Sequence, residues 1–408
     1  MTKPQKKVLK EIRNDFASNQ QMIRLLQGDV GSGKTVVALL SILISIDNNY
    51  QSCLVAPTEI LAFQHFKNFK DKFENLGLVV KVLTGSTKSS DRKILLNDLK
   101  NGSINLLIGT HAIFEQNVIF NNLGYAVIDE QHRFGVKQRS KIWEKNNPPP
   151  HVLIMTATPI PRTLTMSLYG DLDLSIIDEL PPGRKDVITV HRKDKNRLKV
   201  FGFIRDQIKQ GRQIYIVYPL IEESKKMDLK YLEDGLESIT REFDKENYSI
   251  GVMHGRMRSS NKDIEMNNFL NGKIDILIST TVIEVGVNVP NASVMIIENA
   301  ERFGLSQLHQ LRGRVGRGKY DSYCVLMTND KISEDAKIRI DAMVNSNDGF
   351  KISEVDLRLR GPGDVLGTKQ SGVLDFKIAD IIEDESILFS VSNDCLLYTS
   401  PSPRDKTV

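Results

Sequence analysis

Short apolar runs alternate with amphipathic stretches along most of the chain. The runs are rich in β-branched residues, end in small or polar ones, and are mostly apolar throughout, as in strands of a sheet that is covered on both faces. In the first half we expect strands at Ile23–Gln27, Cys53–Ala56, Val79–Thr84, Leu106–Gly109, Ala126–Asp129 and Val152–Met155. In the second half we expect them at Ile214–Tyr218, Ile250–Met253, Ile274–Ser279, Val294–Ile297 and Tyr323–Met327.

Helical periodicity fills several of the intervals between these strands, as at Ile60–Phe73 and Arg92–Leu99. The longest apolar run, Val36–Ile46, is too short to cross a bilayer and indicates a buried helix. Alternating strands and helices predict an α/β fold with doubly wound parallel sheets. The turn-rich segment Leu180–Arg184 separates the two halves, so we expect a domain boundary there.

The sheet pattern stops near Asp330. A helical stretch follows, and then a Gly- and Arg-rich segment, Arg358–Gly372, which we interpret as a functional appendage. Residues 395–408 interrupt a helical pattern with Ser and Pro, so we expect a disordered tail and assign it no function. The expected divisions of the chain are 1–181, 182–345, 346–394 and 395–408.

Composition adds little to this picture. The chain has 408 residues, which suits two domains and a small appendage, and its 40% hydrophobic and 26% charged residues are typical of globular proteins. The formal charge of +4 permits a polyanionic partner without requiring one. Cys53, Cys324 and Cys395 lack CxxC spacing, which argues against a zinc site or a disulfide framework. Without a signal peptide, we expect a cytoplasmic protein with no membrane partner.

Residues 28–35 (GDVGSGKT) match the phosphate-loop pattern GxxxxGK[ST], after a predicted strand and before an apolar helix. In such a loop the backbone amides turn toward phosphate oxygens, and the N-terminus of the following helix favours the anion. The lysine reaches the β and γ phosphates, and the hydroxyl that follows it binds Mg²⁺. The alternative is a glycine turn without a ligand. The expected ATP-binding residues here are Gly28, Gly31, Ser32, Gly33, Lys34 and Thr35.

Asp129 and Glu130 follow an apolar strand (residues 125–128), at the strand end where ligands bind in open α/β sheets. Asp129 is a candidate Mg²⁺ ligand, and Glu130 is placed to orient or deprotonate the attacking water. A solvated acidic turn is the alternative, which the phosphate loop of the same sheet makes less favourable. His132 is either a surface histidine or a residue that couples nucleotide state to domain closure.

These motifs resemble those of superfamily 2 helicases. Residues 129–132 (DEQH) resemble motif II, and Thr156–Thr158 resembles motif III. Similarity to the strand-contacting motifs Ia, Ib and Ic lies at Pro57–Glu59, Gly85 and Gly109–His111. Residues Thr280–Asn288 resemble motif V, and Gln307–Gly318 resembles motif VI.

Within that superfamily the sequence is most similar to the RecG family. Residues 129–135 and 157–164 are shared with RecG and with the transcription–repair coupling family Mfd, and 356–372 looks like the translocation motif of both. Residues 172–184 and 219–224 are similar to RecG specifically. RecG proteins carry an N-terminal wedge domain, whereas this sequence begins just inside the motor.

The resemblance implies two tandem RecA-like P-loop domains with parallel sheets and a small C-terminal helical or hairpin appendage. It implies an ATP- and Mg²⁺-dependent helicase or translocase that moves on duplex DNA at branched structures, in fork reversal and Holliday-junction migration. The expected protein is a monomer that works in the bacterial cytoplasm, at the nucleoid. Lys34, Asp129 and Glu130 would be catalytic.

The resemblance also implies roles for residues outside the phosphate loop. Arg314 and Arg317 would act as arginine fingers, unless they belong to a solvated basic loop. Gly286 would lie at the domain interface, and Gln5 would mark the edge of an adenine-contacting segment. The expected nucleic-acid contacts are Thr58, Thr110, His254, Gly255, Arg256, Thr280, Arg358, Arg360 and Gln370, the last three in a loop-and-hairpin lever.

Three other interpretations stay open at this point. An Mfd-like translocase would use the same motor motifs, although residues 172–184 and 219–224 favour RecG. An RNA helicase is disfavoured by DEQH in motif II and by the translocation segment. A nucleotide-dependent scaffold that does not turn over is disfavoured by the intact Glu130, Arg314 and Arg317.

Overall fold

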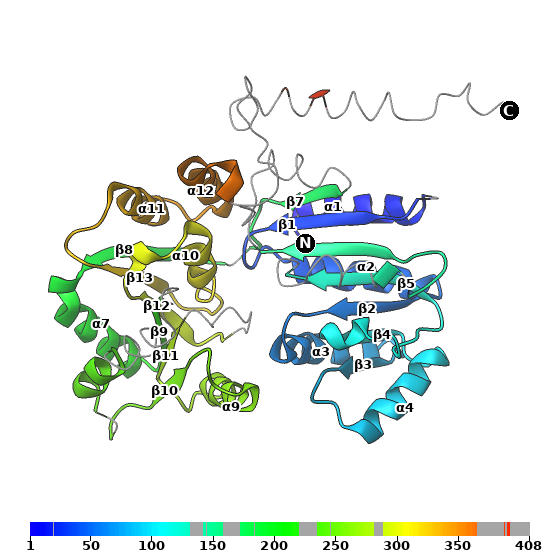
Figure 1. The fold of residues 1–408 in the computed structure, drawn as a ribbon, viewed down its shortest axis with the longest axis horizontal. Helices are drawn as coiled ribbons and strands as arrows, with labels where there is room; N and C mark the ends of the chain where they lie inside the picture. Colours follow the sequence, from blue (N-terminus) through cyan, green and yellow to red (C-terminus); the bar gives the residue numbers. More distant parts are fainter. Residues whose placement is uncertain are drawn as a thin grey trace.

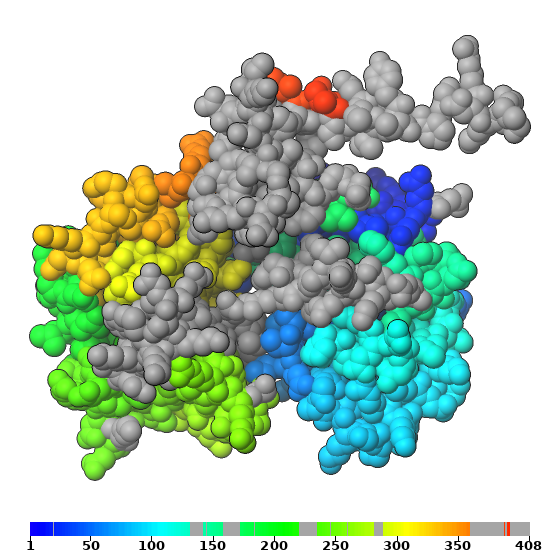
Figure 2. Space-filling view, in the orientation of Figure 1, coloured from blue at the N-terminus to red at the C-terminus, as the bar shows by residue number. Residues whose placement is uncertain are grey.

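The computed structural model describes residues 1–18, 20–130, 142–143, 145–157, 172–182, 184–219, 235–244, 246–280 and 289–364, together with 387, 390 and 391. Two parallel sheets form two bodies that lie side by side, the first mostly blue to cyan with β7 in green, and the second green to orange (Figures 1 and 2). The chain leaves the first sheet at Ile177 and enters the second at Val187. The predicted α/β class with two RecA-like units is confirmed.

The first sheet has seven strands in the order β3-β4-β2-β5-β6-β1-β7, and each neighbouring pair is parallel. The strands are β1 (Ile23–Gly28), β2 (Gln51–Val55), β3 (Val80–Leu83), β4 (Leu106–Gly109), β5 (Leu123–Asp129), β6 (His151–Thr156) and β7 (Asp173–Ile177).

The second sheet has six parallel strands in the order β10-β11-β9-β12-β13-β8. The strands are β8 (Val187–Lys193), β9 (Gln213–Tyr218), β10 (Ile250–Met253), β11 (Ile276–Thr280), β12 (Ala292–Ile297) and β13 (Ser322–Thr328).

Helices connect and cover these strands (Figure 1). The α-helices are α1 (Lys3–Phe16), α2 (Lys34–Asp47), α3 (Glu59–Glu74), α4 (Ser89–Lys100), α7 (Arg197–Lys209), α9 (Ser259–Leu270), α10 (Leu305–Arg312), α11 (Glu334–Asn345) and α12 (Gly349–Asp364). Short 3₁₀ turns are η1 (His111–Phe114), η3 (Asp194–Asn196) and η5 (Ala300–Arg302).

Each sheet is buried on both faces, which explains its continuous apolar strands. On β1, Leu25 packs into the core on one face and Leu26 into the core on the other. On β9, Ile216 and Val217 divide in the same way between two separate cores. Successive side chains of a strand point to opposite faces, so a strand covered twice needs apolar residues at every position.

The two sheets are built on one plan. Six strands correspond in order when β8 is matched to β1, β9 to β2 and β12 to β5. Gln51 opens β2, and its Nε2 donates to the Leu99 and Ile104 carbonyls at 2.9 and 2.8 Å. Gln213 opens β9 and donates to the Phe269 and Ile274 carbonyls at 2.6 and 2.8 Å. In each domain, a buried glutamine amide therefore links the end of a helix to the segment that leads into the neighbouring strand.

The turn after that helix is repeated as well. Residues 101–105 (NGSIN) and 271–275 (NGKID) follow α4 and α9, and both glycines have a left-handed backbone, with φ of 80° at Gly102 and 71° at Gly272. Consequently, Thr110 after β4 and Thr280 at the end of β11 occupy equivalent places in the two domains.

The strands expected from apolar runs are all present, but β7 and β8 were missed. Their buried positions alternate with exposed or half-buried ones, as at Ser175 and Ile177 in β7. Both lie at an outer edge of their sheet, and neither has the continuous apolar run that identified the other strands.

The appendage begins as a helix. The resemblance implies a loop-and-hairpin lever within Arg358–Gly372, but α12 continues to Asp364, so the first part of this segment is helical. Leu357 and Ile352 of this helix are buried, so its packing outweighs the low helix propensity of Gly361 and Gly363. The predicted hairpin and the tail at 395–408 lie outside the described residues.

Each sheet holds one buried cysteine, Cys53 in β2 and Cys324 in β13. Both side chains are fully excluded from solvent, and burial raises the pKa of each thiol to about 12. Within the described residues, no helix is both long and apolar enough to span a bilayer.

Candidate functional site

The phosphate loop connects β1 to α2 and depends on left-handed glycines. Gly31 and Gly33 have φ of 80° and 90°, and Gly33 is the N-cap of α2. A Cβ atom on Gly33 would lie 2.2 Å from Nε2 of Gln5, so a side chain there would be both strained and blocked. The loop therefore presents its backbone, rather than side chains, to the space in front of α2.

Gln5 supports this loop from behind. It forms a capping box with Thr2, whose backbone amide donates to Oε1 of Gln5 at 2.9 Å. Nε2 of Gln5 donates to the Ser32 carbonyl at 2.8 Å. Both ends of the Gln5 amide are thus used within the protein, and the side chain does not line the pocket described next. Its expected contact with adenine stays a prediction.

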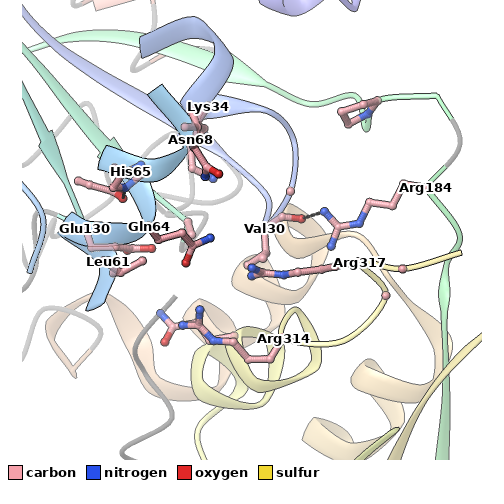
Figure 3. A pocket seen from close by; sticks show the side chains of 18 of the residues that line it. Val30, Lys34, Leu61, Gln64, His65, Asn68, Glu130, Arg184, Arg314 and Arg317 are labelled. Carbon is pink, nitrogen blue, oxygen red and sulfur yellow. Dashed lines mark hydrogen bonds and ion pairs between the residues drawn. The ribbon is translucent and has the colours of Figure 1, made fainter. Parts of the chain in front are cut away.

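A cavity of about 500 Å³ lies where the two domains meet at the phosphate loop (Figure 3). This volume is in the range of small-molecule sites. The cavity brings together predicted residues from both halves of the chain, and the described side chains that line it include Gly31, Lys34, Thr35, Asp129, Glu130, Arg314 and Arg317.

Lys34 is buried and bends back over the loop. Its Nζ donates to the carbonyls of Gly28 and Asp29 at 2.7 and 3.0 Å. Burial lowers the pKa of Lys34, Glu130 and Asp129 raise it, and the net direction is downward. Burial deprives the ammonium group of hydration, and a bound phosphate would compensate for this loss with its negative charge.

The acidic pair stands at the end of β5. Nε2 of His65, on α3, lies 3.0 Å from Oδ2 of Asp129. Glu130 has a φ of 54°, a left-handed backbone that is uncommon for a residue with a side chain and that occurs most often at functional sites. Burial and the neighbouring Asp129 raise the pKa of Glu130, although Lys34 and Arg314 oppose them. A raised pKa makes this carboxylate a better proton acceptor.

Arginines from the second domain form the opposite wall. Figure 3 shows Arg314 and Arg317 facing Lys34, His65 and Glu130 across the cavity. Nε of Arg317 donates to the Gly313 carbonyl at 3.1 Å, and burial together with the nearby Arg314 and Arg184 lowers the pKa of Arg317. Several cations that repel one another in a closed space are matched to a polyanion.

A second link joins the domains through Asp29 of the phosphate loop. Oδ1 of Asp29 lies 2.5 Å from Nε2 of His309, on α10. Oδ2 accepts a hydrogen bond from the Gly349 amide at the start of α12, at 3.2 Å. One carboxylate of the phosphate loop thus holds two helices of the other domain.

Arg312 orients this histidine. Its guanidinium lies 2.9 Å from Nδ1 of His309 and donates to the carbonyls of Met343 and Ser346 at 2.9 and 2.7 Å. Arginine is only a donor, so Nδ1 must accept and the ring proton must lie on Nε2, facing Asp29. The turn between α11 and α12 is therefore connected to the phosphate loop through two side chains.

Several nucleic-acid candidates carry buried polar atoms without a partner. Among the described residues these include Oγ1 of Thr110 and of Thr280, and Nδ1 of His254. Thr110, His254 and Thr280 lie at or just beyond the carboxyl ends of β4, β10 and β11. Buried hydroxyl groups are normally satisfied, so these atoms mark places where a ligand could supply the missing partner.

The remaining candidates are spread over other elements. Thr58 is the N-cap of α3 and accepts from the Leu61 amide at 3.4 Å. Gly255 and Arg256 are exposed after β10, and Arg358 is exposed on α12. Gly286, Gln370, His132 and the side chain of Arg360 lie outside the described residues.

Sequence reasoning missed several contributors to the pocket, among them Gln64 and Asn68 of α3. His65, Arg184 and Gln310 also line it, although no role was predicted for any of them. The only available signals were that Arg184 ends a segment characteristic of one helicase family, and that Gln310 lies inside the stretch that resembles motif VI.

Comparison with family models divides the chain into three matches. Residues 2–167 match the DEAD/DEAH box helicase model, and residues 196–319 match the helicase conserved C-terminal domain. Residues 346–398 match the model described as ATP-dependent DNA helicase RecG, domain 3, C-terminal.

Curated relatives cover nearly all of the chain. The ATP-dependent DNA helicase RecG of Synechocystis sp. is 53% identical over 388 residues, which is 95% of this chain and 46% of that protein. The Bacillus subtilis protein of the same name is 49% identical over 394 residues, 97% of this chain and 57% of that protein. The chain therefore spans about half the length of the curated relatives that it matches.

A solved structure of RecG bound to a three-way DNA junction superposes with a TM-score of 0.80 at 44% identity. It covers 95% of this chain, and the chain covers 50% of it. Over the part that it spans, this chain belongs to the RecG family of helicases.

Proposed function

We propose that the chain is an ATP-driven motor that moves on duplex DNA at branched structures, as in replication-fork reversal and Holliday-junction migration during recombination and repair. The observation that carries this proposal is the composition of the pocket. Lys34, Thr35, Asp129 and Glu130 come from the first domain, while Arg314 and Arg317 come from the second. A site completed by two domains can couple hydrolysis to their relative movement.

The residues fit a nucleoside triphosphate with Mg²⁺. The Thr35 hydroxyl and the Asp129 carboxylate line one cavity, and Mg²⁺ is commonly held by one or two such oxygens together with substrate phosphates. When bound, the metal would neutralise charge on the phosphates. Glu130 would orient and deprotonate water, and Lys34, Arg314 and Arg317 would neutralise the transferred phosphoryl group.

Nucleic-acid contacts are proposed at the carboxyl ends of strands in both domains. The equivalent places of Thr110 and Thr280, and the unpartnered hydroxyl of each, support a pair of matched backbone contacts. Small polar side chains at such places hold phosphates without reading bases. Thr58, His254, Gly255 and Arg256 extend this surface, and Arg358, Arg360 and Gln370 are proposed to act from the appendage.

The proposed domain bounds are 1–181, 182–345 and 346–394, followed by the tail. The change of sheet between Ile177 and Val187 and the start of α12 at Gly349 support them. We propose further that the chain acts as a monomer at the bacterial nucleoid. An Mfd-like function is not favoured, because residues 346–398 match a RecG domain and the curated relatives named above are RecG helicases.

The test is phosphate release at fixed low salt with no DNA, with linear duplex and with a model fork. Stimulation by both DNAs is expected, and it should fall with added salt because phosphate contacts release counterions. Preference for the fork would indicate that junction choice lies within these residues, while equal stimulation would assign it elsewhere. ATP binding without stimulation by any DNA would contradict the proposed motor and favour a scaffold.

Lys34→Ala should abolish turnover, because it removes the cation that reaches the β and γ phosphates. Lys7→Ala is the matched control, since Lys7 is on the surface of α1 with 79% of its side chain exposed. Normal phosphate release by Lys34→Ala would show that the nucleotide site has been assigned wrongly.

A further inference from the structure

Arg184 is a third arginine at the nucleotide pocket, and it belongs to neither sheet. It lies in the segment that connects β7 to β8, close to Pro181 and Pro182, which line the same cavity. The arginines expected to meet the nucleotide are Arg314 and Arg317, on the loop after α10. Arg184 reaches the pocket from a different direction and from a different part of the chain.

The guanidinium of Arg184 is seated on the phosphate loop itself. Its Nη1 donates to the carbonyl of Val30, as the dashed line in Figure 3 shows. A Cβ atom placed on Gly31 would lie only 1.2 Å from that Nη1, so the guanidinium occupies the space a side chain would take there. The left-handed backbone of Gly31, with φ of 80°, favours glycine at this position, and the guanidinium fills the space beside it.

This arrangement leaves the charge of Arg184 poorly compensated. A guanidinium has five N–H donors, yet within the described residues Arg184 makes one hydrogen bond, to a neutral carbonyl, and no ion pair. The side chain is half-buried, and burial lowers its pKa although Asp29 and Asp186 act in the opposite direction. A half-buried cation with spare donors, beside Lys34 and Arg317, is placed to receive an anion.

We propose that Arg184 binds the polyphosphate of the nucleotide and thereby connects the interdomain linker to nucleotide occupancy. The assignment rests on the proposed ATP-dependent function. Arg184 contacts Val30 and Gly31 of the first domain, so it can reach the phosphates without any closure of the second domain. It therefore contributes to binding of both ADP and ATP, whereas Arg314 and Arg317 depend on closure.

The test is Arg184→Gln. Glutamine removes the charge and keeps an N–H donor on a shorter side chain. We expect the Kd for a fluorescent ADP, and for a non-hydrolysable ATP analogue, to rise by about 10- to 100-fold, as for loss of a hydrogen bond to a charged group. KM for ATP should rise in parallel, and kcat at saturating ATP should change less than about threefold.

Two further variants make the test specific. Lys185→Gln is the matched control, because Lys185 pairs with Asp321 at the surface and both side chains are more than half exposed. Arg184→Lys keeps the charge but loses the planar fork, so it should recover part of the lost affinity. If Arg184→Gln does not fold, Arg184→Met replaces it, because methionine is a flexible unbranched side chain without the charge. Wild-type ADP affinity in folded Arg184→Met would overturn the proposal.

The affinities and kcat of Arg184→Gln decide between a nucleotide contact and other roles. Unchanged affinities in folded Arg184→Gln would overturn the proposal and leave a structural contact. A fall in kcat without a change in either Kd would overturn it too, because the residue would then act on the transition state. If the unmodified chain binds ADP but no DNA stimulates hydrolysis, the motor function fails while the Arg184 assignment is still tested by ADP binding.

Discussion

His65 connects a helix of the first domain to the candidate metal ligand. It is buried at 6% exposure on α3, and its Nε2 lies 3.0 Å from Asp129. The same helix begins at Thr58, a candidate nucleic-acid contact, and lines the pocket with Leu61 and Gln64. We infer that His65 positions the Asp129 carboxylate, which its Nε2 contacts directly.

We predict that His65→Ala lowers kcat by about 10- to 100-fold, because a hydrogen bond to a partly buried carboxylate is lost. His65→Gln should recover part of the rate, since its amide can donate to Asp129. Steady-state phosphate release with saturating DNA measures both. Lys67→Ala, on the exposed side of α3, is the control. If His65→Ala turned over at the wild-type rate, the contact would have no part in hydrolysis.

Among the secondary-structure elements, the contact between the phosphate loop and α10 has a pH dependence with a definite sign. Burial would raise the pKa of Asp29, but the hydrogen bond from His309, together with the Val30 amide and the charge of Lys34, brings it below the ordinary value. Arg184 is the other charged group nearby. A lowered folded pKa means that Asp29 stabilises the protein above its unfolded pKa of about 3.9, and that this stabilisation is lost as pH falls through the folded value.

Asp29→Asn should therefore cost about 1.5–3 kcal/mol near pH 6, a typical value for a hydrogen bond to a charged group. The difference in stability from the wild type should shrink toward zero as pH falls below about 4. Thermal unfolding measured from pH 3 to pH 7 tests this, with Asp71→Asn on the surface of α3 as a control. A deficit of constant size across that range would rule out the proposed linkage.

Sequence patterns predicted those elements whose signal is contiguous. The phosphate loop and the 129–130 pair are short motifs with a fixed geometry, and strands such as β4 are continuous apolar runs. Contacts that depend on tertiary structure were not predictable. His65 meets Asp129, and His309 meets Asp29, across long stretches of chain, and no local pattern records which surfaces the two domains bring together.

Edge strands and the appendage show the same limit. Strand β8 lacks an apolar run because several of its side chains remain exposed or half-buried, as Ile188 does at 49%. Helix α12 extends through glycines that locally disfavour a helix. In both cases packing against distant elements decides the structure, and sequence reasoning considers only neighbours along the chain.

Taken as a whole, the molecule is a pair of similar domains that differ in what they contribute to the shared pocket. The first domain supplies the phosphate loop and the acids, and the second supplies the arginines. Equivalent hydrogen bonds from Gln51 and Gln213 stabilise the two domains separately. Asp29 links the phosphate loop to the second domain, and Ile60 of α3 packs against the core of that domain.

Each domain has one buried cysteine whose rate of modification by a thiol reagent reports how often that domain opens. Thiol reagents attack the thiolate, and neither Cys53 nor Cys324 can ionise or meet a reagent until its sheet opens. In a Cys395→Ser background, we predict that both thiols react at least about 1,000-fold more slowly than in denatured protein. Comparable rates in native and denatured protein would contradict the burial described above. Mass spectrometry of the modified peptides would give a separate modification rate for each domain. Nucleotide or DNA that stabilises one domain would lower the rate of that cysteine and leave the other rate unchanged.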